Sequence, residues 1–342
     1  MALDDEGGGL INTSLTRPPS DRTEYGVASD DELLVFSGSA SPKLTQAICA
    51  RLGVPVGKSE VIRFSEGTLF VRIGENVRGR DVFLVQSTVF PANDHFMEAL
   101  FWVDAFKRAS AASVTVLIPY FSYAKGDKKD EPRVSIRARV CADSLEAAGA
   151  DRIVAVDLHA PQLQGFFRVP VDDLQARPTL CDAVVVEGIE SPVVVSPDEG
   201  FVKRATMFAD RLDSSLAIGH KRRRGHDERA ELVELIGEVE GRSCLVVDDF
   251  IISGITLIKV AETLMARGAT RVMAAITHGV FNASAAERLD HSPIERIYVT
   301  DTIENHPFPL PSKTRVVGIA PLLAEAILRI QRRESISVLF RD

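Results

Sequence analysis

The residues best suited to chemistry stand in one polar segment that follows the apolar run Leu245–Val247. Two neighbouring carboxylates, Asp248 and Asp249, come first, and their oxygens can accept hydrogen bonds from sugar hydroxyls. Free backbone N–H groups at the start of the next helix can hold a phosphate. That start is formed by Ile252, Ser253, Gly254, Ile255 and Thr256. The segment predicts a site for a phosphorylated sugar, although an acidic turn before a serine helix cap has the same pattern.

Two further polar loops follow apolar runs and contain possible metal-binding residues. One contains His159 after the run Ile153–Val156, and the other contains Asp198 after Val193–Val195. A carboxylate and an imidazole at neighbouring strand ends could orient hydrated Mg²⁺, which prefers oxygen ligands and keeps several of its waters. Either loop alone is more typical of a structural turn.

Two basic segments could neutralise a polyphosphate. The first runs from Tyr123 to Lys129 and the second is Lys221–Arg224. Mobile cations of this kind can close over the charge that develops during phosphoryl transfer, while a solvated charged loop is the alternative interpretation. A third segment, Arg63–Thr68, ends a predicted strand with Phe64. This aromatic ring could stack on a base or form part of an ordinary hairpin turn.

Alternating strands and helices must position these loops. From Leu33 onward, short β-branched runs alternate with amphipathic helical patterns, an order typical of parallel sheets with helices on both faces. The clearest pairs are Leu33–Phe36 with a helix at about 44–52, Val82–Val85 with one at about 96–109, and Leu245–Val247 with one at about 257–267. In such sheets ligands bind beyond the carboxyl ends of the strands, which is where the polar loops lie.

The two halves of the chain resemble one another. VFSGSASPKLTQAICARL is echoed by VVSPDEGFVKRATMFADRL roughly 160 residues later, a spacing that suits two domains of ordinary size. We therefore predict an N-terminal domain over residues 32–174 and a C-terminal domain over 175–320. Residues 1–31 are rich in Gly, Ser, Asp, Thr and Pro, and we expect a disordered tail there.

The composition argues against several classes of function. The net charge is −8, so the surface as a whole repels nucleic acid and acidic membranes. We expect neither as a partner, and no apolar run approaches the roughly 18 residues needed to cross a bilayer. The four cysteines are scattered singly without a C-x-x-C pair, which argues against a disulfide framework and fits a cytoplasmic location.

These segments, in this order, resemble the ribose-phosphate diphosphokinase family, also called phosphoribosyl pyrophosphate synthetase. The match runs from about Leu33 to Phe340 and includes GKSEVIRFSEG, NVRGRDVFLVQST, DLHAPQLQGFF, VVSPDEG, VVDDF, PLLAEAILRI and ESISVLF. The resemblance implies an α/β fold of two tandem phosphoribosyltransferase-type domains, each with a parallel sheet flanked by helices. It also implies a final helix over 321–342 that packs back on the first domain. It also implies transfer of the diphosphoryl group of Mg·ATP to ribose 5-phosphate, in a dimer-based homo-oligomer such as a hexamer.

The same resemblance implies a role for each polar loop. The catalytic residues would be Lys221, Arg223 and His159, and Mg²⁺ would be held by His159 and Asp198. ATP would be bound by Phe64, Glu66, Thr68, Lys125, Gly126 and Asp127, the first three reaching the nucleotide of a neighbouring subunit. The diphosphate loop would be Asp198, Glu199, Gly200 and Phe201. Ribose 5-phosphate would be bound by Asp248, Asp249, Ile252, Ser253, Gly254, Ile255 and Thr256.

The phosphate segment departs from the family pattern, because Ile252 stands where Asp or Thr is usual and Ile255 where Gly is usual. Glycine permits close approach and unusual φ, which a β-branched residue resists, so we expect a strained backbone at Ile255. Two alternatives stay open. A phosphoribosyltransferase shares the VVDDFIISGIT pattern but not the duplicated length. A non-catalytic or weakly active regulatory relative would assemble with an active synthetase.

Overall fold

The computed structural model describes residues 33–189, 191–222 and 231–340. The predicted tail, residues 1–31, lies outside the described residues. Within the described part, no helix has both the length and the apolar character needed to cross a bilayer.

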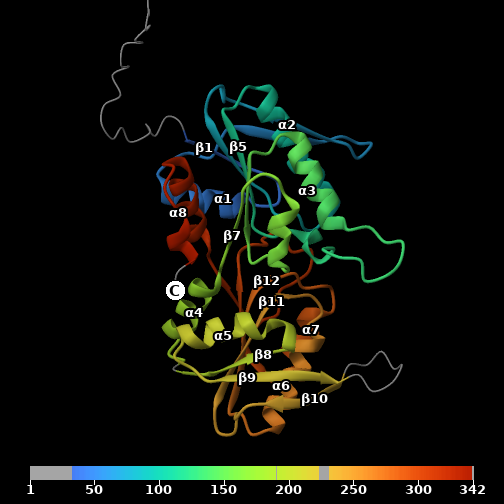
Figure 1. Cartoon of the computed structure of the whole chain (residues 1–342), viewed down its shortest axis with the longest axis vertical. Helices are drawn as coiled ribbons and strands as arrows, with labels where there is room; N and C mark the ends of the chain where they lie inside the picture. The colour runs from blue at the N-terminus through green and yellow to red at the C-terminus, as the bar shows by residue number, and fades with distance from the viewer. Residues whose placement is uncertain (1–32, 190, 223–230, 341–342) are drawn as a thin grey trace, which may run out of the picture.

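The N-terminal half is built on a five-stranded parallel sheet, with strand order β1-β4-β5-β6-β7. An antiparallel hairpin of β2 and β3 projects from it (Figure 1). The elements are β1 (Leu33–Ser37), α1 (Pro42–Leu52), β2 (Ser59–Arg63), β3 (Leu69–Ile73), β4 (Asp81–Val85), α2 (Ala92–Arg108), β5 (Ser113–Ile118), η2 (Ser122–Lys125), α3 (Arg137–Ala148), β6 (Arg152–Val156), η3 (Pro161–Phe166) and β7 (Val171–Leu174).

The C-terminal half contains a seven-stranded sheet with strand order β10-β9-β8-β11-β12-β13-β14, in which β10 alone runs antiparallel to its neighbour. Helix α8 then returns to the first half. The elements are α4 (Arg177–Val186), β8 (Val193–Ser196), η4 (Glu199–Phe201), α5 (Val202–Arg211), β9 (Leu216–Arg222), β10 (Glu231–Ile236), β11 (Ser243–Ile251), α6 (Ile255–Ala266), β12 (Arg271–Gly279), α7 (Ala285–Asp290), β13 (Ile294–Thr300), β14 (Thr314–Val317), α8 (Ala320–Gln331) and η5 (Ser337–Phe340).

Local sequence explains these elements. Strand β8 is buried along its whole length, as expected for a parallel strand covered on both faces, and its first three residues are valines. Helix α1 begins with Pro42, whose fixed φ suits a first turn, and it ends at Gly53 with φ of 72°, a left-handed conformation that glycine adopts readily. The predicted α/β fold and its three strand–helix pairs are confirmed.

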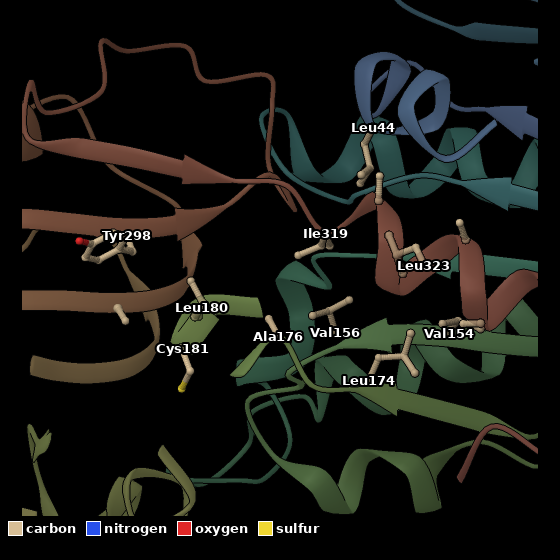
Figure 2. Packing of buried hydrophobic residues seen from close by; sticks show 14 of the residues in the cluster. Leu44, Val154, Val156, Leu174, Ala176, Leu180, Cys181, Tyr298, Ile319 and Leu323 are labelled. Atoms are coloured by element: carbon tan, nitrogen blue, oxygen red, sulfur yellow. The ribbon is translucent and has the colours of Figure 1, made fainter. Parts of the chain in front are cut away.

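One apolar cluster joins the halves. Leu44 of α1 packs with Leu323 of α8, and the same cluster continues through Leu174 and Leu180 to Tyr298 in the C-terminal sheet (Figure 2). Figure 1 shows α8 beside α1, the first helix of the chain. The C-terminal helix thus completes the core of the N-terminal half.

Buried polar contacts also hold the halves together where the carboxyl ends of both sheets meet. Nε2 of His278, at the end of β12, lies 3.0 Å from the carbonyl oxygen of Val156 at the end of β6. The Thr277 hydroxyl donates to Asp157 Oδ2 at 2.6 Å, and the Ser87 hydroxyl donates to the Thr302 carbonyl at 2.6 Å. Complete burial lowers the pKa of His278, which favours the neutral imidazole. The strand ends of the two halves therefore face one another at fixed positions.

Candidate functional site

A cavity of about 990 Å³ lies where the strand ends of the C-terminal sheet meet the N-terminal half. Its wall combines the end of β11, the start of α6, the loop after β8 and the loop after β6. The predicted residues that line it are His159, Asp198, Gly200, Phe201, Asp248, Asp249, Ile252, Ser253, Gly254, Ile255 and Thr256. Three loops that are far apart in the sequence are thus brought to one cavity.

The two carboxylates at the end of β11 differ in their surroundings. The backbone N–H of Asp249 donates to Oδ1 of Asp248 at 2.9 Å. Burial, and then the charge of Asp249, raise the pKa of Asp248. Burial alone would raise the pKa of Asp249 as well, but the hydrogen bond and charge of His159 and the charge of Arg204 lower it. Asp249 is therefore the ionised member of the pair, while Asp248 is the member that a nearby cation or donor would stabilise.

His159 and Arg204 hold Asp249 from two sides. Nδ1 of His159 lies 2.7 Å from Oδ2 of Asp249, and the imidazole is 43% exposed, so Nε2 remains for a ligand. Arg204 donates from Nη2 to the Leu158 carbonyl at 2.5 Å, and its Nη1 lies 3.8 Å from Asp249 Oδ2. Arg204 was missed by sequence reasoning, because a single arginine inside a helical pattern carries no local signal beyond its place after the diphosphate loop.

The phosphate cradle is formed by the start of α6. Gly254 has φ of 74° and precedes the helix. A Cβ at this position would lie 2.9 Å from the side chain of Leu289, so a larger residue would need both a left-handed backbone and a shift of Leu289. The first N–H of the helix that bonds back along it is that of Ile258, which donates to the Gly254 carbonyl at 2.9 Å. The amides before it have no carbonyl partner within the helix and can receive an anion.

The expectation of backbone strain at Ile255 is wrong. Ile255 is the first residue of α6 and is not among the residues with positive φ. The left-handed conformation falls one residue earlier, on Gly254. The side chains of Ile252 and Ile255 are 37% and 46% exposed, so each β-branched side chain is accommodated at the cavity wall without an unusual backbone.

The loop after β8 forms a compact turn. Asp198 Oδ1 accepts a hydrogen bond from the Gly200 N–H at 3.0 Å and so caps η4. Phe201 is buried behind this turn. Glu199 departs from the other members of the predicted diphosphate loop, because its exposed carboxylate pairs with His220 of β9 and is not part of the cavity wall.

Of the predicted ATP residues, Lys125, Gly126 and Asp127 follow one another at the end of η2, and Lys125 contacts Phe250 at the cavity wall. Lys125 ends η2, and its Nζ lies 3.2 Å from the ring centroid of Phe250. Partial burial of this ammonium lowers the pKa of Lys125, opposed by the charges of Asp249 and Asp248, although the residue as a whole is exposed. Gly126 is packed so closely that a Cβ would lie 2.8 Å from Arg137.

Asp127 accepts a hydrogen bond from Gln162 Nε2 at 3.1 Å. Phe64, Glu66 and Thr68 stand apart from the cavity, on the turn between β2 and β3, where all three are exposed. The Thr68 hydroxyl donates to Glu66 at 2.8 Å. Within one chain this turn is not brought to the carboxylate pair.

Lys221, one of the two predicted catalytic cations, lies at the end of β9. The backbone of Lys221 pairs with that of Leu232 in the β9–β10 ribbon, and Arg223 lies outside the described residues.

Asp173 on β7 also lines the cavity, although the sequence did not suggest it as a site residue. Burial raises its pKa to about 7, although the Leu158 N–H and Arg204 oppose the shift. The pattern of β7 alone gave no sign of this burial.

Comparison with known proteins identifies the family. Residues 33–149 match the N-terminal domain of ribose phosphate pyrophosphokinase, and residues 228–341 match the phosphoribosyl synthetase-associated domain. A ribose-phosphate pyrophosphokinase of Caldanaerobacter subterraneus is 46% identical over 316 residues, which cover 91% of this chain and 98% of that protein. One of Rhizobium meliloti is 47% identical over 308 residues, covering 90% and 99%.

A solved structure agrees with the sequence comparison. The crystal structure of phosphoribosylpyrophosphate synthetase from Mycobacterium smegmatis matches with a TM-score of 0.81 and 39% identity, covering 88% of this chain and 99% of that one. Both halves and their order are thus shared with synthetases, which does not favour the regulatory alternative. The chain belongs to the ribose-phosphate pyrophosphokinase family.

Proposed function

We propose that this chain transfers the diphosphoryl group of ATP to the C1 hydroxyl of ribose 5-phosphate. In this reaction the hydroxyl oxygen attacks the β-phosphorus of ATP, the bond from that phosphorus to the oxygen it shares with the α-phosphate breaks, and AMP leaves while the hydroxyl gives up its proton. The observation that carries the proposal is the shared cavity in which Asp248, Asp249, His159 and the open start of α6 meet.

The end of β11 and the start of α6 suit ribose 5-phosphate. The amides that precede Ile258 would hold the 5-phosphate, since they have no partner within the helix and lie at its positive end. Asp248 and Asp249 would accept hydrogen bonds from the ribose hydroxyls. The distance along the wall from Thr256 to the carboxylates would then fix which end of the sugar faces the donor. Positioning of this kind supplies much of the rate of phosphoryl transfer.

The residues present fit a magnesium ion that is held partly by substrate. His159 and Asp198 bring an imidazole and a carboxylate to the cavity, while no group of three or more His, Cys, Asp or Glu within the described residues could hold a metal by itself. Mg²⁺ commonly uses one or two carboxylates with substrate phosphates and waters. In this assignment His159 and Asp198 would hold Mg²⁺, which would neutralise phosphate charge when bound.

The remaining predicted residues would act on ATP, the donor of the diphosphoryl group. Lys125, which contacts the same Phe250 ring as His159, would contact ATP together with Gly126 and Asp127, and the turn with Phe64 would contact the nucleotide of a neighbouring subunit. Lys221 and Arg223 would stabilise the charge of the transferring group, as basic residues do in phosphoryl transfer. The turn after β8 would receive the diphosphate through its backbone amides, with Lys203 and Arg204 as nearby cations at the cavity wall.

We also infer a cytoplasmic homo-oligomer, built from dimers. The hairpin residues Phe64 and Phe70 expose 45% and 38% of their surface, and Met97 and Phe101 of α2 expose 42% and 38%. Large exposed apolar side chains of this kind mark protein contacts when they gather. The dependence of activity on protein concentration would test this point.

The decisive experiment is the release of AMP. Purified protein given only ATP, ribose 5-phosphate and Mg²⁺ should form AMP and phosphoribosyl diphosphate at equal rates. A phosphoribosyltransferase would require a nucleobase, and a regulatory relative would form no AMP without an active partner. His159→Ala should abolish the reaction or raise its magnesium requirement. Folded wild-type protein that forms no AMP under these conditions would contradict the proposal.

A further inference from the structure

Phe250 lies between Lys125 and His159, two residues that the proposed function assigns to ATP and its Mg²⁺ ion. It follows Asp249 near the end of β11, and its ring is contacted by two residues of the N-terminal half. Nζ of Lys125 lies 3.2 Å from the centroid of the ring. The imidazole of His159 meets the ring edge-on, with 5.3 Å between the two centroids. One aromatic side chain of the C-terminal half thus contacts both a cation and an imidazole of the other half.

The ring of Phe250 is itself held in place. It packs against an apolar cluster that draws residues from both halves, namely Val89, Tyr120, Val280 and Ile303. Its backbone lies within the sheet, opposite His278 of β12 in the register of the two strands. A side chain that is fixed by both its cluster and its strand can act as a platform for a long, flexible lysine side chain, which otherwise samples many rotamers.

The ammonium of Lys125 has an aromatic partner rather than an acidic one. Among the residues that the structure describes, no ion pair or hydrogen bond of Lys125 is present besides its contact with Phe250. An aromatic face attracts a cation through its quadrupole but carries no net charge. A carboxylate partner would have neutralised the ammonium. The ring therefore orients Lys125 without the direct ion pair that would neutralise it, and the charges of Asp249 and Asp248 favour its protonated form.

We propose that Phe250 is a positioning residue that holds Lys125 and His159 for the polyphosphate chain of the nucleotide donor. The identity of that ligand rests on the proposed function. Phe250 acts through the two side chains it holds and need not touch the donor itself. Its loss should weaken donor binding more than ribose 5-phosphate binding, because His159 keeps its hydrogen bond to Asp249 and the start of α6 is not part of the cluster that holds the ring.

Steady-state kinetics of Phe250→Leu test this selectivity. The loss of the cation–π contact should raise the KM for ATP about tenfold, while the KM for ribose 5-phosphate stays within about twofold. Phe250→Tyr keeps the ring and should behave as wild type. Phe308→Leu, at an exposed phenylalanine of the same half, is the matched control. A purely structural role would lower Tm and raise both KM values together, which would overturn the proposal.

A double substitution tests whether the effect passes through Lys125. In a Lys125→Ala background, Phe250→Leu should add less than twofold to the KM for ATP. Equal effects of Phe250→Leu with and without Lys125 would contradict the assignment. If Phe250→Leu does not fold, Phe250→Met, which conserves volume and lacks the ring, replaces it in both experiments.

An NMR measurement tests the contact without turnover. Reductive ¹³C-methylation keeps the lysine charge, and the methyl signal that disappears in Lys125→Arg belongs to Lys125. This signal should be shifted upfield by the ring current in the wild type and should move downfield in Phe250→Leu. An unchanged signal would overturn the pairing even if the enzyme is active. If no AMP forms but the shift is present, the proposed function fails and the pairing stands, and calorimetry with ATP then decides whether Phe250→Leu weakens binding.

Discussion

The two halves of this chain use the same strand–helix unit in opposite ways. In the C-terminal half, the helix starts after β8 and β11 line a cavity. In the N-terminal half, the corresponding positions after β1 and β4 are closed by the protein's own side chains. The N–H groups of Lys43 and Leu44, at the start of α1, donate to the carboxylate of Glu304, both at 2.9 Å. A helix start that could hold an anion thus holds one that belongs to the chain itself.

The loops after β1 and β4 in the N-terminal half are likewise closed by the protein's own side chains. The Ser39 N–H donates to the buried carboxylate of Glu98 at 2.8 Å, and the Ala40 N–H donates to Gln86 Oε1 at 3.0 Å. Gln86 and Ser87, which stand where the other half has Asp248 and Asp249, are fully buried. Similar backbones therefore give a binding cavity in one half and a closed, self-satisfied core in the other. The difference lies in whether the polar groups find partners within the chain.

The largest expected effect comes from the carboxylate that anchors the cavity. Asp249→Asn removes the charge that holds His159 and Arg204, and kcat/KM should fall by on the order of 100-fold or more. Ser87→Ala is the matched change in the other half. It should cost about 1 kcal/mol of stability, because the Thr302 carbonyl loses its donor, with little change in kcat/KM. Equal losses of activity in both variants would break the comparison.

Much of this arrangement could be predicted from the sequence, because it depends on local pattern. Strand and helix periods located the loops, and the position of the carboxylates at a strand end predicted their place at the cavity. The contacts that close the N-terminal half could not be predicted in this way. Glu304 caps a helix that begins more than 250 residues earlier, and the Lys125–Phe250 contact also joins separate halves. Ile255 was misjudged because the sequence did not reveal that the left-handed residue would be Gly254.

The next effect concerns pH and the N-terminal wall of the cavity. Burial raises the pKa of Asp173 in the folded state to about 7, against 3.8 as its ordinary value. Between these values the folded state binds more protons than the unfolded state, so the free energy of unfolding falls as pH rises. Asp173→Asn should flatten this dependence and exceed wild-type stability at pH 8 by on the order of 2 kcal/mol. Urea unfolding of the wild type and of Asp173→Asn at pH 5 and pH 8 measures the pH dependence and the difference in stability.

Three groups around Asp173 also act on the pKa of its carboxyl group. Asp173 accepts the Leu158 N–H at 2.9 Å, the charge of Asp157 raises its pKa further, and Arg204 from the other half lowers it. An Asp173→Asn protein with the same pH dependence as wild type would show that Arg204 keeps this carboxylate ionised. The N-terminal wall would then be as charged as the C-terminal one.

A smaller effect is expected at the closed helix start of the N-terminal half. Glu304→Gln weakens two charge-assisted hydrogen bonds to α1, which should lower the free energy of unfolding by about 1 kcal/mol. Activity should not change, because α1 does not line the cavity. Glu295→Gln, which breaks the exposed ion pair with Arg271, is the control and should cost less than about 0.5 kcal/mol. A loss of activity in Glu304→Gln would show that the closed start also serves the site.

The smallest effect is expected at Ile255, whose side chain lies at the cavity wall at the start of α6. Because Ile255 is an ordinary first residue of α6, Ile255→Gly releases no backbone strain. The KM for ribose 5-phosphate should change by less than about twofold, while added flexibility in the first turn costs up to about 1 kcal/mol of stability. Ile255→Ala separates bulk from backbone, since it removes the branched side chain and keeps a good helix former. If both variants lower the KM several-fold, the side chain obstructs the phosphate. If only Ile255→Gly does so, the bound loop must adopt a backbone that Ile resists, and the start of α6 would have to rearrange when the sugar phosphate binds.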